Sequence, residues 1–171
     1  MNATSTLTLG GLLAALVILT CNLYPWWTGN REAKQLAAFG KGFGAAACAA
    51  ACPGGVLGWA HSHSGSVGNG AGERASQALT GTNSASGLTS GQLVGLGTTG
   101  AIIVVIAVTL VVLSYKQAGK KDKRRIVGGA YVGSTLCLTA GVAGALAWLP
   151  DALNGIGDSI AQAFEGAGAL L

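Results

Sequence analysis

Charged side chains are scarce in this sequence. Asp, Glu, Lys and Arg together make up 9% of the 171 residues, against about 25% in an ordinary soluble domain. Residues 1–30 carry no charged side chain, half of the chain is apolar, and 29 residues are glycine. A soluble domain of this length needs a charged surface around its core. The composition therefore excludes that class and indicates that lipid is the surrounding solvent.

Residues that carry chemistry are also few. His61 and His63 form an H-x-H pair, but no Cys, Asp or Glu lies nearby in the sequence to complete a metal site. The four cysteines are Cys21, Cys48, Cys52 and Cys137. Each falls within an apolar run, where a free thiol packs as a small apolar residue. With no phosphate-binding loop and no paired carboxylates, we expect a protein that is not an enzyme, with no catalytic residue, no metal and no cofactor.

The carboxyl half contains two long uncharged runs. Residues 94–115 would form a helix of about 33 Å, enough to cross a hydrocarbon core of about 30 Å. The run is rich in β-branched residues, but it is much longer than a strand. A second uncharged run covers residues 126–149. Residues 93–149 are therefore predicted to form a transmembrane hairpin with a basic cytoplasmic turn at 116–125.

The amino half contains two weaker candidate spans. Residues 7–27 favour a retained helix over a cleaved signal peptide, because no Lys or Arg precedes Leu7. Residues 42–60 are less certain, since Pro53 and the glycines after it would kink or break a helix. A re-entrant or interfacial segment is the alternative for this second span. Residues 1–60 are predicted to form an amino-terminal helical hairpin.

The remaining segments are predicted to lie outside the spans. Residues 61–92 are rich in Gly, Ser and Asn and are typical of a flexible linker. The tail, residues 150–171, places Leu153, Ile156, Ile160 and Phe164 at helical spacing, which predicts a short amphipathic helix at the membrane interface. The expected fold is an all-α integral membrane protein with four transmembrane helices in two hairpins. The order of span, gap and span occurs twice, a coarse duplication beneath which we identify no residue-level repeat.

Basic residues predict the orientation in the cell membrane. Nine of the ten Lys and Arg residues lie in the gaps 30–41 and 116–125, which the positive-inside rule places in the cytoplasm, with the linker and tail outside. The basic turn contains Lys116, Lys120, Lys121, Lys123, Arg124 and Arg125. Such a cluster satisfies that rule alone, and it can also contact anionic lipid or DNA phosphates without sequence preference.

Two further sets of residues are predicted to act at the membrane. The expected interface anchors are Tyr24, Trp26, Trp27, Trp59 and Trp148. The expected helix-packing positions are Gly128, Gly129, Gly133, Gly141 and Gly144. Small residues let two helix backbones approach closely in lipid. A G-x-x-x-G pattern also arises by chance in a chain this rich in glycine.

The order of elements from residue 93 to residue 149 carries a resemblance. An uncharged span, a short turn rich in Lys and Arg and a second span opening with Gly128-Gly129 resemble the small pilin-like two-helix subunits of type IV secretion and conjugation systems. Related membrane proteins of actinobacterial conjugative elements share this order. The resemblance implies two helices inserted in the cytoplasmic membrane with the basic turn inside, and glycines at packing positions. It covers about a third of the chain, which has two further apolar segments in place of a cleaved leader.

The functional hypothesis follows from that resemblance. We expect a non-catalytic, self-associating structural or channel component of a conjugative DNA-transfer or secretion apparatus, in contact with lipids and with other subunits of the machine. A phage holin-like pore former is the first alternative, because a holin also combines few spans with a charged cytoplasmic end. An accessory subunit of another membrane complex is the second.

Overall fold

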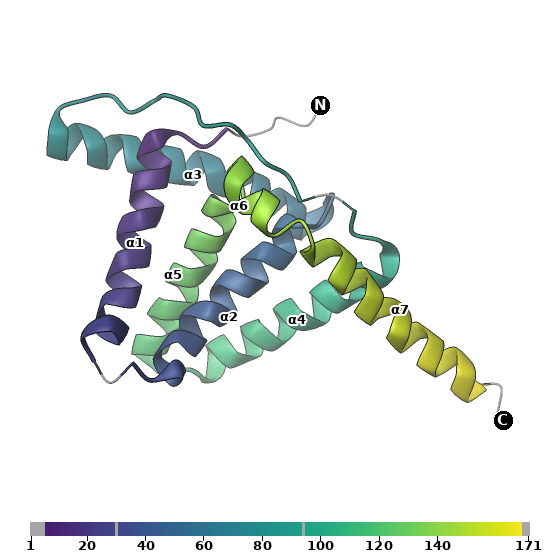
Figure 1. The fold of residues 1–171 in the computed structure, drawn as a ribbon. Helices are drawn as coiled ribbons and strands as arrows, with labels where there is room; N and C mark the ends of the chain where they lie inside the picture. The colour runs from purple at the N-terminus through teal and green to yellow at the C-terminus, as the bar shows by residue number, and fades with distance from the viewer. Residues whose placement is uncertain (1–5, 30, 94, 169–171) are drawn as a thin grey trace.

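The computed structural model describes residues 6–29, 31–93 and 95–168, and the side chains of all of these except 34, 35, 167 and 168. Within these ranges the protein is all-helical (Figure 1). Its helices are α1 (Leu9–Thr28), α2 (Ala33–Ala50), α3 (Gly55–Thr80), α4 (Thr98–Gln117), α5 (Lys120–Leu136), α6 (Ala140–Ala145) and α7 (Leu149–Gly168).

Helices α1 and α4 are long and apolar enough to cross a membrane, with 20 residues each, or about 30 Å. Both expose large apolar side chains, among them Leu13 and Val17 on α1 and Ile102 and Val105 on α4. Such exposed faces are unfavourable in water and suited to lipid. The described chain therefore has two candidate spans, or three if α2 and α3 are counted as one broken span, and is compatible with a multi-pass membrane protein.

The second predicted span is broken. Helix α2 begins at Ala33, earlier than expected, and ends at Ala50, and the chain bends by 106° before α3. Pro53 and Gly54 lie in this break, as expected from the missing N–H of proline and the weak helix propensity of glycine. The bend directs α3 across α1 (Figure 1).

The segment predicted to be a flexible linker is mostly helical, so that prediction was wrong for residues 61–80. Gly65, Gly68 and Gly72 are buried in α3, whose neighbours are α1, α2 and α5. Tertiary packing of this kind can stabilise a helix of low intrinsic propensity. The helix ends at Gly81, whose φ of +67° suits glycine. From there to Gly97 the described residues of the connection form no helix, and they make isolated bridges from Gly87 to Thr8 and from Ser90 to Thr139.

The predicted carboxyl-terminal hairpin is also different in the structure. Residues 126–149 do not form one helix, because α5 ends at Leu136, α6 is short and α7 begins at Leu149. Helix α4 packs mainly against α7, and α5 packs mainly against α2. The segment predicted as a basic turn is helical except around Ala118 and Gly119, since Lys and Arg favour helix. The two halves of the chain are thus joined through their interiors.

Glycine contacts between α2 and α5 form the centre of the molecule. A Cβ added at Gly129 would lie 3.0 Å from the backbone nitrogen of Phe43 and closer still to the carbonyl oxygen of Phe39. One added at Gly42 would lie 2.8 Å from the backbone nitrogen of Ala130 and closer to the carbonyl oxygen of Ile126. The two backbones therefore touch where each has no side chain, which is the close packing that small residues permit in lipid.

Candidate functional site

Four helix ends meet at the basic end of the molecule. Helix α1 ends and α2 begins around Arg31, while α4 ends and α5 begins around Gly119. Both connections lie toward the same end of the bundle (Figure 1). Among the side chains that the structure describes, the exposed cations there are Arg31, Lys41, Lys116, Lys120, Lys121 and Arg124. The sequence predicted that both basic segments lie on one side of the membrane.

Two of the predicted basic residues are partly or fully buried. Arg125 is 8% exposed, and its Nη1 lies 3.9 Å from Oδ1 of Asp122 one helical turn earlier. Lys123 is half-buried, and its Nζ lies 5.5 Å from the centre of the Tyr115 ring. A cation over an aromatic face is attracted to the ring. Arg125 is therefore part of the packed structure, whereas Lys123 keeps part of its side chain exposed.

Aromatic residues from outside the basic cluster accompany the cations in the structure. Besides the pair of Lys123 and Tyr115, the guanidinium carbon of Arg31 lies 5.0 Å from the centre of the Trp27 ring. Tyr115 and Lys123 are not neighbours in the sequence, so the sequence alone does not reveal their contact. The short connection between α4 and α5 brings them together. This end thus combines positive charge with aromatic rings, as expected where a protein meets lipid headgroups.

A groove opens between α1, the end of α4 and the start of α5. It has a volume of about 470 Å³. It is lined by Ile18, Asn22, Tyr115, Lys123, Arg124, Val127, Gly128 and Tyr131. The lining joins two cations to a mainly apolar wall. Chemically, it can accept a molecule that has both an anionic group and a hydrocarbon chain.

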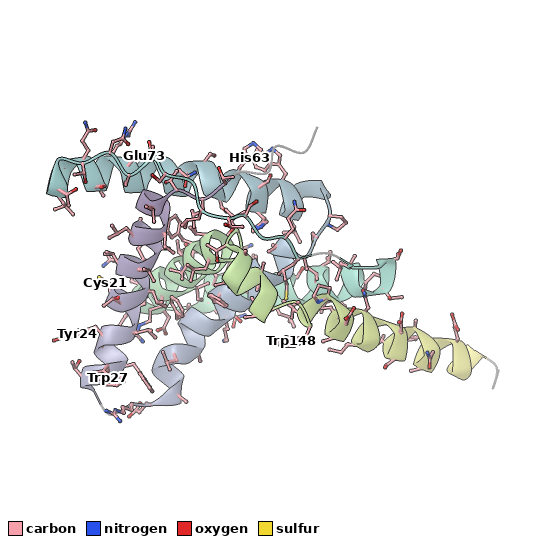
Figure 2. The ribbon with its side chains drawn as sticks, turned by 45° about the horizontal axis from the view of Figure 1, so that its top comes forward. Cys21, Tyr24, Trp27, His63, Glu73 and Trp148 are labelled. Atoms are coloured by element: carbon pink, nitrogen blue, oxygen red, sulfur yellow. The ribbon has the colours of Figure 1, made fainter. Side chains whose placement is uncertain are left out.

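The predicted interface anchors lie at both ends of the molecule. Tyr24 and Trp27 are exposed near the end of α1, as Figure 2 shows, and Trp26 beside them is half-buried. Trp59 in α3 and Trp148 between α6 and α7 are exposed, and Trp148 lies away from Tyr24 and Trp27 in the same view. Aromatic residues at two separate levels are typical of a membrane protein with two interfaces.

The predicted packing glycines divide into two groups. Gly129 and Gly133 lie against α2, and a Cβ at Gly128 would lie 2.8 Å from Nδ2 of Asn22 in α1. At Gly141 and Gly144 an added Cβ would meet no atom within 4 Å. The first three therefore pack inside the chain, and the last two lie in open space.

The histidines and cysteines are dispersed. His61 Nδ1 lies 3.2 Å from Oγ of Ser134, whereas His63 stacks on Trp59 with ring centres 4.3 Å apart. Within the described ranges, no three His, Cys, Asp or Glu side chains are grouped to hold a metal ion. All four cysteines are free, with Cys21 exposed and Cys137 buried.

Comparison of the chain with protein-family models, with curated proteins and with solved structures finds no match in any of the three. The function is therefore inferred from the geometry of this chain and from the pattern of its sequence.

Proposed function

We propose that this chain is a non-catalytic integral membrane protein that serves as a structural or channel-forming subunit of a conjugative DNA-transfer or secretion apparatus. The observation that carries the proposal is the outward-facing apolar surface of α1 and α4, which suits lipid. The cations at one end support a fixed orientation. The order of span, basic segment and glycines in residues 93–149 resembles that of pilin-like subunits, and this resemblance supports the assignment to a DNA-transfer or secretion apparatus.

Self-association is assigned to the outer faces of α1 and α4. Gly129 and Gly133 are covered by α2 within the same chain, which argues against their use between copies. The exposed apolar side chains on those faces, among them Leu13 of α1 and Ile102 of α4, remain available to a second copy. In lipid, van der Waals packing of such faces contributes to helix association.

The orientation places the basic end in the cytoplasm. Both connections that hold the cations lie at that end, so a single rule orients both halves. The N-terminal ends of α1 and α4, the 81–97 connection and the carboxyl tail then lie outside. Labelling of a cysteine at Gln117 from the cytoplasmic side only is the check on this assignment.

Expression of the full chain tests the functional proposal. We expect it to resist carbonate extraction from membranes, to leave the membrane potential unchanged, and to run in mild detergent as an oligomer. Deletion of its gene in the encoding organism should lower the frequency of conjugative transfer at least tenfold. Rapid loss of membrane potential followed by lysis would instead identify a holin-like pore former, and normal transfer after deletion would contradict the conjugative role.

The groove at the basic end is assigned to an anionic phospholipid. Lys123 and Arg124 would hold the phosphate, and the apolar wall at Ile18 and Val127 would contact the first part of an acyl chain. Each basic residue near a membrane surface contributes about 1 kcal/mol toward anionic lipid. DNA phosphate has the same charge but no chain to occupy the apolar wall.

Lipid binding is expected to fall when the groove loses its cations. The double variant Lys123→Gln with Arg124→Gln should bind phosphatidylglycerol about tenfold more weakly, measured by native mass spectrometry of the detergent-solubilised chain. The matched control, Lys120→Gln with Lys121→Gln, removes the same charge outside the groove and should change binding much less. Equal losses in both variants would show that overall charge, and not the groove, attracts the lipid.

A further inference from the structure

Two asparagines make the same contacts in the two halves of the chain. Asn69 in α3 accepts a hydrogen bond from the backbone nitrogen of Thr8 at 2.8 Å and donates one to the carbonyl oxygen of Thr6 at 2.8 Å. Asn154 in α7 accepts one from the nitrogen of Gly97 at 2.8 Å and donates one to the carbonyl oxygen of Gly95 at 2.7 Å. Each asparagine therefore fixes the two residues that lead into an apolar helix, α1 or α4.

The sequence around both asparagines is the same. Residues 69–73 read NGAGE and residues 154–158 read NGIGD, so the pattern is Asn-Gly-x-Gly followed by an acid. The second glycine of each pattern makes an equivalent close approach. A Cβ at Gly72 would collide with the backbone of Gly10 in α1, and one at Gly157 would lie 2.5 Å from the backbone of Thr99 in α4.

The first helices of the two halves also correspond at three positions when they are aligned by the asparagine contacts. Placing Gly11 of α1 on Gly100 of α4 places Ala15 on Val104, and both of these side chains have 0% exposure. The same alignment places Thr20 on Thr109, and each hydroxyl donates to the carbonyl oxygen four residues earlier. These three shared positions support an equivalence of α1 and α4.

The central helices contact each other reciprocally. Gly42 lies against the backbone of Ile126 and Ala130, and Gly129 lies against the backbone of Phe39 and Phe43. Placing Gly42 on Gly129 places Phe39 on Ile126 and Phe43 on Ala130, so each contact has its partner. Gly133 continues the series against Phe43 and Ala46. Positions rise together along both helices, so α2 and α5 run parallel about an approximate two-fold axis.

We propose that the chain is a tandem duplication of one membrane unit, and that its third elements, α3 and α7, both lie along the lipid surface at the end opposite the basic residues. In the second unit, the counterpart of α3 is divided into α6 and α7, because Pro150 opens α7. The bend of 106° between α2 and α3 turns α3 away from the direction of the spans. Helices α3 and α7 leave the bundle in different directions (Figure 1). The proposal rests on membrane residence but not on a role in DNA transfer.

Lipid is assigned as the occupant of the apolar side of α7. The exposed apolar residues Ile156, Ile160 and Phe164 follow helical spacing along α7, while its acids, Asp151, Asp158 and Glu165, recur every seven residues on another side. Asn154 bonds the start of α7 to Gly95 and Gly97, just before α4 begins, so α7 lies at the level where an apolar span begins. An amphipathic helix at that level presents its apolar side to acyl chains and its acids to water.

Site-directed labelling of the full chain tests the proposal, after replacement of its four cysteines by serine. A cysteine at Glu73 and one at Asp158 should both react with a membrane-impermeant maleimide added outside, while one at Gln117 should not. Nitroxides at Ile160 and Phe164 should collide several-fold more often with oxygen dissolved in lipid than a nitroxide at Glu165, which should collide with a water-soluble nickel complex.

The outcomes separate the alternatives. Reaction of Glu73 and Asp158 from opposite sides would overturn the parallel duplication. Equal collision of oxygen with nitroxides on both sides of α7 would overturn its surface position. So would a loss of oxygen collision at Phe164 as the protein-to-lipid ratio rises, because a second copy of the chain would then cover the helix. Resistance of the chain to carbonate extraction is measured on the same membranes, so failure of membrane residence itself is distinguished.

Discussion

Replacing Gly129 with alanine is expected to lower the free energy of unfolding by about 3 kcal/mol, because a core without space for an added methyl group must distort. The new Cβ would collide with the carbonyl oxygen of Phe39 and lie 3.0 Å from the nitrogen of Phe43. Backbone atoms of a helix cannot move aside as a flexible side chain does. The measurement is unfolding of the chain in dodecyl maltoside by titration with sodium dodecyl sulfate, followed by far-ultraviolet circular dichroism.

Two further variants make this experiment specific. Gly42→Ala is expected to lose a similar amount, because Gly42 makes the reciprocal contact with Ile126 and Ala130. Gly141→Ala is the matched control, since an added Cβ there meets no atom within 4 Å, and the better helix propensity of alanine should leave stability unchanged or raised by up to about 1 kcal/mol. If all three glycines tolerate alanine equally, the close packing of α2 on α5 is wrong.

Replacing Asn69 or Asn154 with alanine is expected to lower the free energy of unfolding by about 2 kcal/mol each. A hydrogen bond contributes about 1 kcal/mol net. Each asparagine bonds one backbone N–H and one backbone carbonyl oxygen, both of which lie just before a helix and outside its own hydrogen bonds. The two sites share no partner, so the losses in the double variant should add. The same detergent titration measures the effect.

Ser159→Ala is the control for the asparagine variants. Ser159 is exposed in α7, and its Oγ donates within its own helix, to the carbonyl oxygen of Gly155 at 2.7 Å, so its loss should change stability by less than about 0.5 kcal/mol. A loss confined to Asn69, with Asn154→Ala unchanged, would contradict the equivalence of the two halves.

Local signals gave a good account of the apolar helices and of the charge. The first span begins within two residues of the prediction, at Leu9, and the predicted 94–115 run contains most of α4, although residue 94 itself lies outside the described residues. A long uncharged run has few folding options in lipid, since its backbone groups must bond to each other. The cluster at Lys120–Arg125 could be located from its charge alone, whereas the burial of Arg125 could not be predicted from the sequence.

Contacts between distant residues explain the errors. Composition predicted a flexible chain over residues 61–80, because glycine and serine favour disorder when nothing packs against them. Burial of Gly68 and Gly72 in α3 reverses that preference. The sequence marked the glycines of α5 as packing positions without indicating which helix they face, and their partner is α2. Sequence adjacency says little about which helix a small residue faces.

The sequence by itself determined that the chain is helical and apolar, with its positive charge in two short gaps, because these properties follow from residue type and run length. Only the tertiary structure decided which helices pair and that Asn69 and Asn154 are equivalent. A match between two five-residue segments is not significant by itself in a glycine-rich chain. It becomes significant because both asparagines make the same pair of hydrogen bonds to the residues just before an apolar helix. The physical reason is that packing specificity in lipid depends on a few close contacts between segments far apart in the chain.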